Sequence, residues 1–161
     1  MIELHGIAEA QGAKVAVIVS RFNEFITKKL LEGALNTLEE SGVDTDNITV
    51  VWVPGSFELP ATVAEAIETG FDIAVCLGVV IRGETAHFDF VAGEAARGIA
   101  AIATEKRFPV GFGVITAEDT DQALARAGGK KGNKGREAAL AALEMADVFR
   151  RLRGQNRRMI V

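Results

Sequence analysis

The stretch DIAVCLGVVIRGETAHFDF, residues 72–90, contains an apolar run that ends abruptly in a charged and polar segment. In its first part, 72–80, apolar residues stand at successive positions, which is typical of a parallel strand covered on both faces. The following residues, 88–107, have the spacing of an amphipathic helix. The stretch therefore predicts a buried strand followed by a helix.

The same succession occurs three more times along the chain. The other predicted strands are KVAVIV (14–19), ITVVWV (48–53) and PVGFGVI (109–115). Helical patterns follow the strands at 23–42, at 59–70, and at 119–129 with 134–153. Successive βα units predict right-handed crossovers and helices on both faces of a sheet. We therefore expect a doubly wound, three-layer α/β/α sandwich with a four-stranded parallel sheet.

Length and composition indicate a single globular domain. The chain has 161 residues, of which 48% are hydrophobic and 25% charged, values usual for a folded domain. We expect one domain over 1–161, with an N-terminal segment at 1–12 and a flexible tail at 154–161. No apolar run reaches the roughly 20 residues that cross a bilayer, and the N-terminus lacks the pattern of a secretion signal. A cytoplasmic protein is expected.

Charge and metal-ligand content exclude several function classes. The net charge of −4 disfavours binding to nucleic acid. The single cysteine, Cys76, lies inside an apolar run and is predicted to pack as a small buried hydrophobe. With only His5 and His87 besides, the chain has no zinc-ligand spacing. We expect no metal site.

Ligands of doubly wound folds bind beyond the carboxyl ends of the strands, so the residues after each strand are the candidates. After the first strand, Phe22 offers an aromatic face for a planar ligand, or packs under the next helix. After the second, Ser56 and Glu58 offer polar groups, although a plain helix start with Ser56 as its cap explains the same letters.

The loop after the third strand carries the most chemistry. Gly83 permits unusual backbone geometry, and the residues that follow open a helix whose free N–H groups favour an anion such as phosphate. Thr85 adds a hydroxyl. His87 stands about one turn away and can exchange protons near neutral pH. The alternative is a solvent-facing histidine at a helix cap.

The stretch ARAGGKKGNKG, residues 125–135, is predicted to form a turn between two helices. It lacks the GxxxxGK[ST] pattern of a nucleotide-binding loop. Arg126, Lys130, Lys131 and Lys134 are candidate anion ligands, and a solvated basic turn is the alternative.

Five motifs, in order, resemble the lumazine synthase family over roughly residues 6–151. They are SRFNEFIT, VPGSFELP, LGVVIRGETAHFDFV, FGVITAED and RAGGKKGNKGREAA. The resemblance implies a flavodoxin-like fold and an enzyme that condenses 5-amino-6-(D-ribitylamino)uracil with 3,4-dihydroxy-2-butanone 4-phosphate. The products are 6,7-dimethyl-8-ribityllumazine, phosphate and water, in the penultimate step of riboflavin biosynthesis. It also implies that no cofactor or metal is needed.

The resemblance also implies roles for individual residues. His87 takes the family's position of proton donor, and Phe22 stacks on the pyrimidine. Ring and ribityl contacts are implied for Ser56, Phe57, Glu58, Val79, Val80, Ile81 and Phe112. Phosphate contacts are implied for Glu84, Thr85 and Arg126, with Lys134 as a further family lysine. Phe112 and Arg126 are expected to come from a neighbouring subunit.

One position departs from the family pattern. Many members carry alanine where Glu84 stands, and a carboxylate would repel a phosphate. We therefore expect Glu84 to contribute its N–H while its side chain turns away. The tail beyond residue 153 is longer than the family pattern, and we assign it no role.

The family forms pentamers, some of which close into icosahedral shells. Members that stop at pentamers often carry an insertion before KGNKG, and none is seen here, so we expect a closed shell. Two alternatives share the fold: an archaeal-type riboflavin synthase, and a noncatalytic flavin-binding or shell-forming protein. The joint presence of Gly83, Thr85, His87 and Arg126 favours the synthase.

Overall fold

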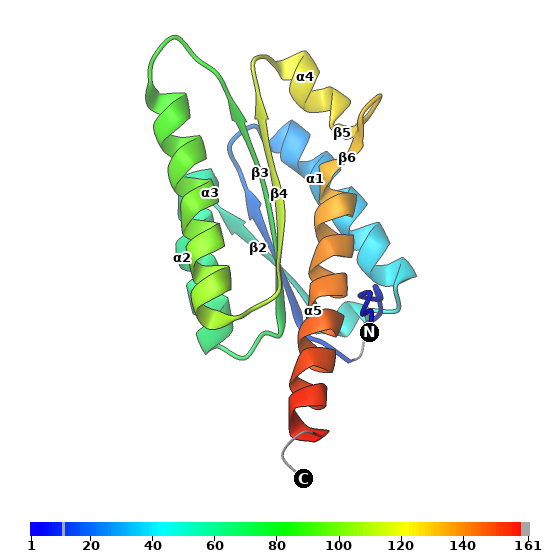
Figure 1. The fold of residues 1–161 in the computed structure, drawn as a ribbon. Helices are drawn as coiled ribbons and strands as arrows, with labels where there is room; N and C mark the ends of the chain where they lie inside the picture. The colour runs from blue at the N-terminus through cyan, green and yellow to red at the C-terminus, as the bar shows by residue number, and fades with distance from the viewer. Residues whose placement is uncertain (11, 159–161) are drawn as a thin grey trace.

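The predicted three-layer α/β/α sandwich is confirmed (Figure 1). The computed structural model describes residues 1–10 and 12–158, with side chains up to 154. Its main sheet has the order β2-β1-β3-β4, with every neighbouring pair parallel. The four strands lie within two residues of their predicted bounds, and they are β1 (Val15–Ser20), β2 (Ile48–Val53), β3 (Ile73–Ile81) and β4 (Val110–Ala117).

Helices cover both faces of the sheet. One face carries α1 (Glu24–Glu40) and α5 (Lys134–Arg158), and the other carries α2 (Leu59–Glu68) and α3 (His87–Lys106) (Figure 1). The short α4 (Thr120–Ala125) follows β4. Single 3-10 turns, η1 (Thr45–Asn47) and η2 (Ser56–Glu58), lie on either side of β2. Within the described residues no helix is both long and apolar enough to span a membrane.

Strand β1 is buried along its whole length, which explains why its sequence does not alternate with polar residues. Val15, Val17 and Val19 pack in the cluster that contains α1 and α5. Ala16 and Ile18 pack in the cluster on the side of α2 and α3.

In β3, burial raises the pKa of the Cys76 thiol to about 12, so this cysteine is the neutral, buried residue that its apolar neighbours predict.

The sequence pattern misplaced the ends of two helices. The helix predicted over 119–129 stops at Ala125, because β5 (Ala127–Gly129) and β6 (Gly132–Asn133) form an antiparallel hairpin. Gly128 and Gly132 have positive φ angles of 101° and 84°, which a helix does not accept. At the other end, α5 continues through 154–158, which the sequence pattern assigns to a flexible tail. The rest of that tail, 159–161, lies outside the described residues.

A close approach of α1 and α5 explains why asparagine and glycine occur in the segment GNKG, residues 132–135. The Asn133 side chain caps α5 by accepting hydrogen bonds from the N–H groups of Gly135 (2.8 Å) and Arg136 (3.2 Å). Its amide also donates to the Lys29 carbonyl of α1 (3.0 Å). A Cβ at Gly135 would collide with the backbone of Leu30. This motif therefore fixes the start of α5 against α1.

A buried carboxylate joins the N-terminal segment to α5. Asp147 is only 3% exposed. Its side chain accepts a hydrogen bond from the Ile7 N–H (3.0 Å) and pairs with Arg150 and with Arg151 (2.9 Å). Burial opposes the charge, but the Arg150 and Ile7 hydrogen bonds and the two arginine charges outweigh it and lower the pKa of Asp147.

Replacing Gly135 by alanine tests the contact between α1 and α5. We expect Gly135→Ala to destabilise the fold by at least about 1–3 kcal/mol, the usual cost of overpacking, because the obstacle is backbone. Gly154, on the same helix, is exposed and has nothing within 4 Å of the added atom. Gly154→Ala should be neutral or stabilising by up to about 1 kcal/mol. Denaturant unfolding measures both, and equal effects would contradict this account.

Asp147→Asn tests the charge at the N-terminal contact. Because the native pKa lies below the unfolded value of about 3.9, the carboxylate stabilises the fold above that pH, and this contribution is lost as pH falls through the native pKa. The introduced amide would keep an acceptor for Ile7 but carry no charge. We expect the variant to be less stable than wild type at pH 7, with the gap narrowing below about pH 4. Thermal unfolding at pH 7 and pH 3 measures this, and a constant gap would refute it.

Candidate active site

A cavity of about 850 Å³ opens at the carboxyl ends of the central strands. The strand order reverses between β1 and β3, so the loops after these strands diverge and leave space, as in other doubly wound folds. The wall comes from the segments after β1, β2 and β3 and from the first two turns of α3. It is lined by Phe22, Pro54, Gly55, Ser56, Phe57, Glu58, Val79, Val80, Ile81, Gly83, Thr85, His87, Phe88, Phe90, Val91 and Glu94.

Most of the residues singled out from the sequence meet in this cavity. The lining includes Phe22, Ser56, Phe57, Glu58, Val79, Val80, Ile81, Thr85 and His87. Four others lie outside it: Glu84, Phe112, Arg126 and Lys134. One chain thus assembles a cavity that contains aromatic side chains and a histidine but lacks Arg126, for which the family resemblance implies a phosphate contact from a neighbouring subunit.

The loops after β1 and β2 each present an exposed phenylalanine on the cavity wall. Phe22 is 64% exposed and Phe57 is 62% exposed. The alternative in which Phe22 packs under the next helix is therefore wrong. Backbone hydrogen bonds from Arg21 to the Val53 carbonyl (2.8 Å) and from Phe22 to the Pro54 carbonyl (3.1 Å) join the loops after β1 and β2. Phe22 and Phe57 therefore lie on adjoining loops of the cavity wall, and their rings can cover a planar ligand.

The turn after β2 is closed by Glu58 and not by Ser56. The Glu58 carboxylate accepts a hydrogen bond from the Gly55 N–H at 2.9 Å, which caps η2. The interpretation of Ser56 as a helix cap is therefore wrong. The Ser56 side chain is 97% buried and has its oxygen 2.5 Å from the point where a Cβ of Gly78 would stand. Its hydroxyl thus lies against β3.

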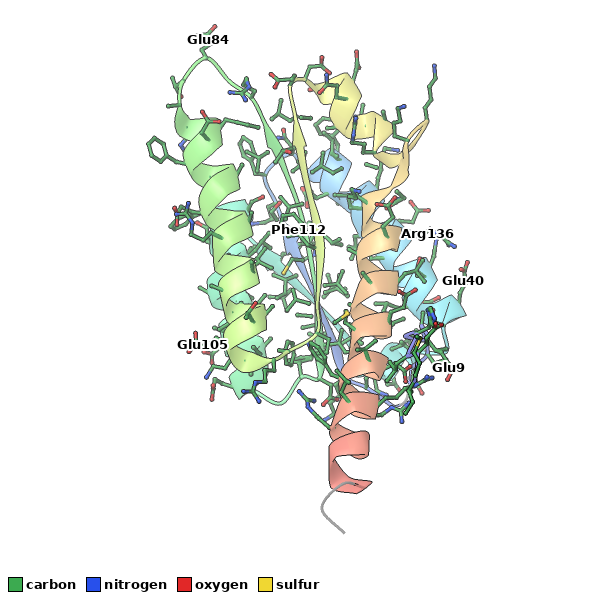
Figure 2. The ribbon with its side chains drawn as sticks, viewed as in Figure 1. Glu9, Glu40, Glu84, Glu105, Phe112 and Arg136 are labelled. Carbon is green, nitrogen blue, oxygen red and sulfur yellow. The ribbon has the colours of Figure 1, made fainter. Side chains whose placement is uncertain are left out.

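The loop after β3 leads directly into α3. His87 is the first residue of this 20-residue helix and lines the cavity. Its backbone N–H donates to the Thr85 hydroxyl (3.3 Å). A helix of this length presents free N–H groups and a positive dipole end at its start. Figure 2 shows Glu84 at the apex of the loop, directed away from the rest of the molecule.

Arg82 fixes the base of this loop, a role that sequence reasoning missed. Its Nε donates to both carboxylate oxygens of Glu118 (2.9 and 3.2 Å). Its guanidinium lies 4.4 Å from the centre of the Phe88 ring, and it pairs with Asp89 at 3.7 Å. One side chain therefore connects the ends of β3 and β4 to the first turn of α3. The signal available was an arginine and a glutamate at the ends of adjacent parallel strands.

The far wall of the cavity was also missed. Phe90, Val91 and Glu94 follow His87 at three, four and seven positions, so they lie on one face of α3. Glu94 also pairs with Arg97 at 2.8 Å. Counting three, four and seven positions from His87 along the predicted helix would have identified these residues as sharing its face.

Arg126 and Lys134 lie beside each other but away from the cavity. The Lys134 N–H donates to the Arg126 carbonyl (2.8 Å), across the ends of the β5–β6 hairpin. The Arg126 guanidinium donates to the Gln122 carbonyl (3.0 Å), and the Lys134 ammonium pairs with Glu137 (2.7 Å). Phe112, labelled in Figure 2, lies on the edge strand β4 and is 46% exposed.

The cavity combines apolar walls with few polar groups, an arrangement typical of sites for small organic molecules. It can cover an aromatic ring, exchange protons through His87 and receive an anion at the start of α3. Within the described residues, no cluster of three or more His, Cys, Asp or Glu side chains could hold a metal ion.

Comparisons with known proteins agree with this description. Residues 12–150 match the family model of 6,7-dimethyl-8-ribityllumazine synthase. A protein of that name from Edwardsiella ictaluri is 52% identical over 155 residues, which cover 95% of this chain and 99% of the relative. Another from Yersinia pestis is 49% identical over 153 residues, covering 94% and 98%. The chain therefore belongs to the 6,7-dimethyl-8-ribityllumazine synthase family.

Proposed function

We propose that this chain condenses 5-amino-6-(D-ribitylamino)uracil with 3,4-dihydroxy-2-butanone 4-phosphate. The products are 6,7-dimethyl-8-ribityllumazine, phosphate and water, in the penultimate step of riboflavin biosynthesis. Membership of the family over nearly the whole chain supports this function. The observation that carries it is the cavity, which gathers an aromatic wall, a histidine and the start of a long helix. We take 1–161 as one domain, and the cytoplasmic location stays an expectation from the sequence.

The aromatic wall suits the pyrimidine substrate. Phe22 and Phe57 are exposed on the wall, so stacking on a planar ring would bury apolar surface that the free chain leaves in water. Val79, Val80 and Ile81, at the carboxyl end of β3, add an apolar part of the cavity lining. The volume of about 850 Å³ falls within the range of roughly 300–1,000 Å³ for small-molecule sites. Both substrates can be held there together.

The start of α3 suits the phosphate of the second substrate. In this proposal Glu84 contributes its N–H and keeps its carboxylate outward, as in Figure 2. Thr85 supplies its hydroxyl, which accepts from the His87 N–H and can at the same time donate its hydrogen to a phosphate oxygen. Arg126 would neutralise the phosphate from a neighbouring subunit, with Lys134 beside it.

His87 is the proton carrier of the proposed reaction. The uracil amine attacks the ketone, and the carbonyl oxygen leaves as water to give an imine. Phosphate then leaves with the electrons of its C–O bond, and tautomerisation exposes a second carbonyl. The ribitylamino nitrogen attacks that carbonyl, and a second water leaves. Each step moves protons between nitrogen, carbon and oxygen, which an imidazole near neutral pH can do in both directions. Holding the two substrates together supplies further acceleration.

An assembly in which subunits share the site completes the proposal. Arg126 and Phe112 lie outside the cavity of their own chain, and Phe112 is exposed on an edge strand. A second, apolar hollow of about 540 Å³ lies between α3 and α5, lined in part by Phe108, Phe149 and Leu152. Exposed apolar surface of this kind is typical of subunit contacts. We propose a pentamer that closes into an icosahedral shell.

Replacing Arg126 and His87 separately tests the two halves of the chemistry. We expect Arg126→Ala to raise the KM for the phosphate substrate roughly 10- to 100-fold, because a charge-assisted contact is lost. We expect His87→Ala to lower kcat by about 10²-fold, the lower end for one acid–base group. Formation of the lumazine product, followed spectroscopically above the uncatalysed condensation, measures both.

Arg136 provides the matched control. It lies on α5, on the other face of the sheet from the cavity, next to Glu40 (Figure 2). Arg136→Ala should leave both kinetic constants unchanged. If folded, assembled wild-type protein does not accelerate the condensation, the synthase proposal is wrong, and an archaeal-type riboflavin synthase or a noncatalytic flavin-binding protein takes its place.

Mixing the two impaired variants tests the shared site. In oligomers reassembled from equal amounts of His87→Ala and Arg126→Ala, about one site in four should combine an intact histidine with an intact arginine from its neighbour. With the phosphate substrate held well below its wild-type KM, where each variant alone is nearly silent, we therefore expect about a quarter of wild-type activity to return. Light scattering of wild type should give the mass of a closed shell. No recovery from mixed oligomers would refute sharing, and free pentamers alone would refute the shell.

A further inference from the structure

Two buried hydroxyl groups meet at the carboxyl end of the sheet, under the cavity. Ser20 ends β1 and is fully buried, and Ser56 begins η2 and is 3% exposed. Neither side-chain oxygen has a hydrogen-bond partner among the described residues. A buried hydroxyl without a partner destabilises a fold. Such groups in native proteins require an explanation.

Gly78 brings the two oxygens together. The pairing of Val19 with Leu77 places Ser20 beside Gly78 in the sheet. A Cβ built on Gly78 would stand 2.5 Å from the Ser56 oxygen and 3.2 Å from the Ser20 oxygen. Both hydroxyls therefore gather on one side of a residue that has no side chain. The surroundings are otherwise apolar, with a Leu59 methyl 3.4 Å from the same point.

We propose that Ser20 is a positioning residue, which acts on the cavity through a buried water molecule shared with Ser56. Buried waters typically make two to four hydrogen bonds to polar groups that otherwise lack partners. Here the two hydroxyls are the partners, and the absence of a side chain at Gly78 allows the Ser56 oxygen to approach β3 on the same side as the Ser20 oxygen. The water joins the end of β1 to the turn after β2.

The consequence for the site lies in the residues that follow Ser56. Phe57 and Glu58 belong to the same short turn and line the cavity, whereas Ser20 does not. Holding Ser56 against β3 fixes the direction in which these two side chains face the ligand. Ser20 thus influences the pyrimidine side of the cavity without touching it. This part of the inference rests on the proposed function.

A double-mutant cycle tests the coupling without any substrate. Ser20→Ala leaves Ser56 and the water with a missing partner, and Ser56→Ala does the same to Ser20. Replacing both removes the polar site altogether, so the double variant should be clearly more stable than the sum of the single effects predicts. Denaturation midpoints measure this.

Thr37 serves as the control, because its buried hydroxyl already donates to the Gly33 carbonyl at 2.7 Å. Thr37→Ala with Ser56→Ala should be additive. Additivity in the Ser20 and Ser56 cycle would overturn the proposal.

Kinetics and a crystal structure test the positioning role and the water. Ser20→Ala should raise the KM for the pyrimidine substrate roughly 3- to 10-fold, with kcat and the KM for the phosphate substrate unchanged. Amide hydrogen exchange should quicken at 55–58. An unchanged pyrimidine KM in an active enzyme would overturn the positioning role. Failure of wild type to make lumazine would refute the proposed function, while the cycle and the exchange rates would still test the coupling. A high-resolution structure should show one water molecule hydrogen-bonded to both serine hydroxyls. A direct hydrogen bond between the two hydroxyls would disprove the bridging water.

Discussion

Burial of the two central strands on both faces is the constraint on which the rest of this structure depends. Because β1 and β3 are covered by α1 and α5 on one side and by α2 and α3 on the other, their polar residues can stand only at or beyond the strand ends. The strands are parallel, so these ends lie at one edge of the sheet. The aromatic, hydroxyl and imidazole groups that line the cavity are gathered there by the packing of the core.

The loops around the cavity differ in how firmly they are held. The turn after β2 is closed by the bond between Glu58 and Gly55, and it is joined to the loop after β1 by backbone hydrogen bonds. The loop after β3 is held at its base by Arg82, while Gly83 has open space around it. A single exposed ion pair contributes little to stability. The Arg82 guanidinium, however, donates to both carboxylate oxygens of Glu118 and also packs on the Phe88 ring. The turn that carries Phe57 and Glu58 is thus held by hydrogen bonds within itself and to the loop after β1, whereas the contacts of Arg82 hold the loop after β3 at its base.

The basic segment 126–135 is positioned by the packing of α5 against α1. Asn133 and Gly135 fix the start of α5 against α1, and the hairpin before it then places Arg126 beside Lys134. Because α5 covers the face of the sheet opposite α3, this segment is held apart from the cavity of its own chain. The glycines and the asparagine in GNKG are explained by close packing and by a helix cap. The two cations are not explained by packing, which is why the proposal places them in a neighbouring site.

The sequence by itself determined the fold class, the strand bounds within two residues, and most of one wall of the cavity, because full burial and helical spacing leave direct traces in local residue patterns. It also singled out Phe22, Thr85 and His87 through their places after predicted strands. Only the tertiary structure decided that Ser56 faces Gly78 and is not a cap, that Arg82 contacts Glu118 and Phe88, and that Phe90, Val91 and Glu94 form the far wall. The contacts of Ser56 and Arg82 depend on strand order and join residues distant in sequence, so no local pattern records them. The far wall follows from helical spacing only once the structure shows that His87 faces the cavity.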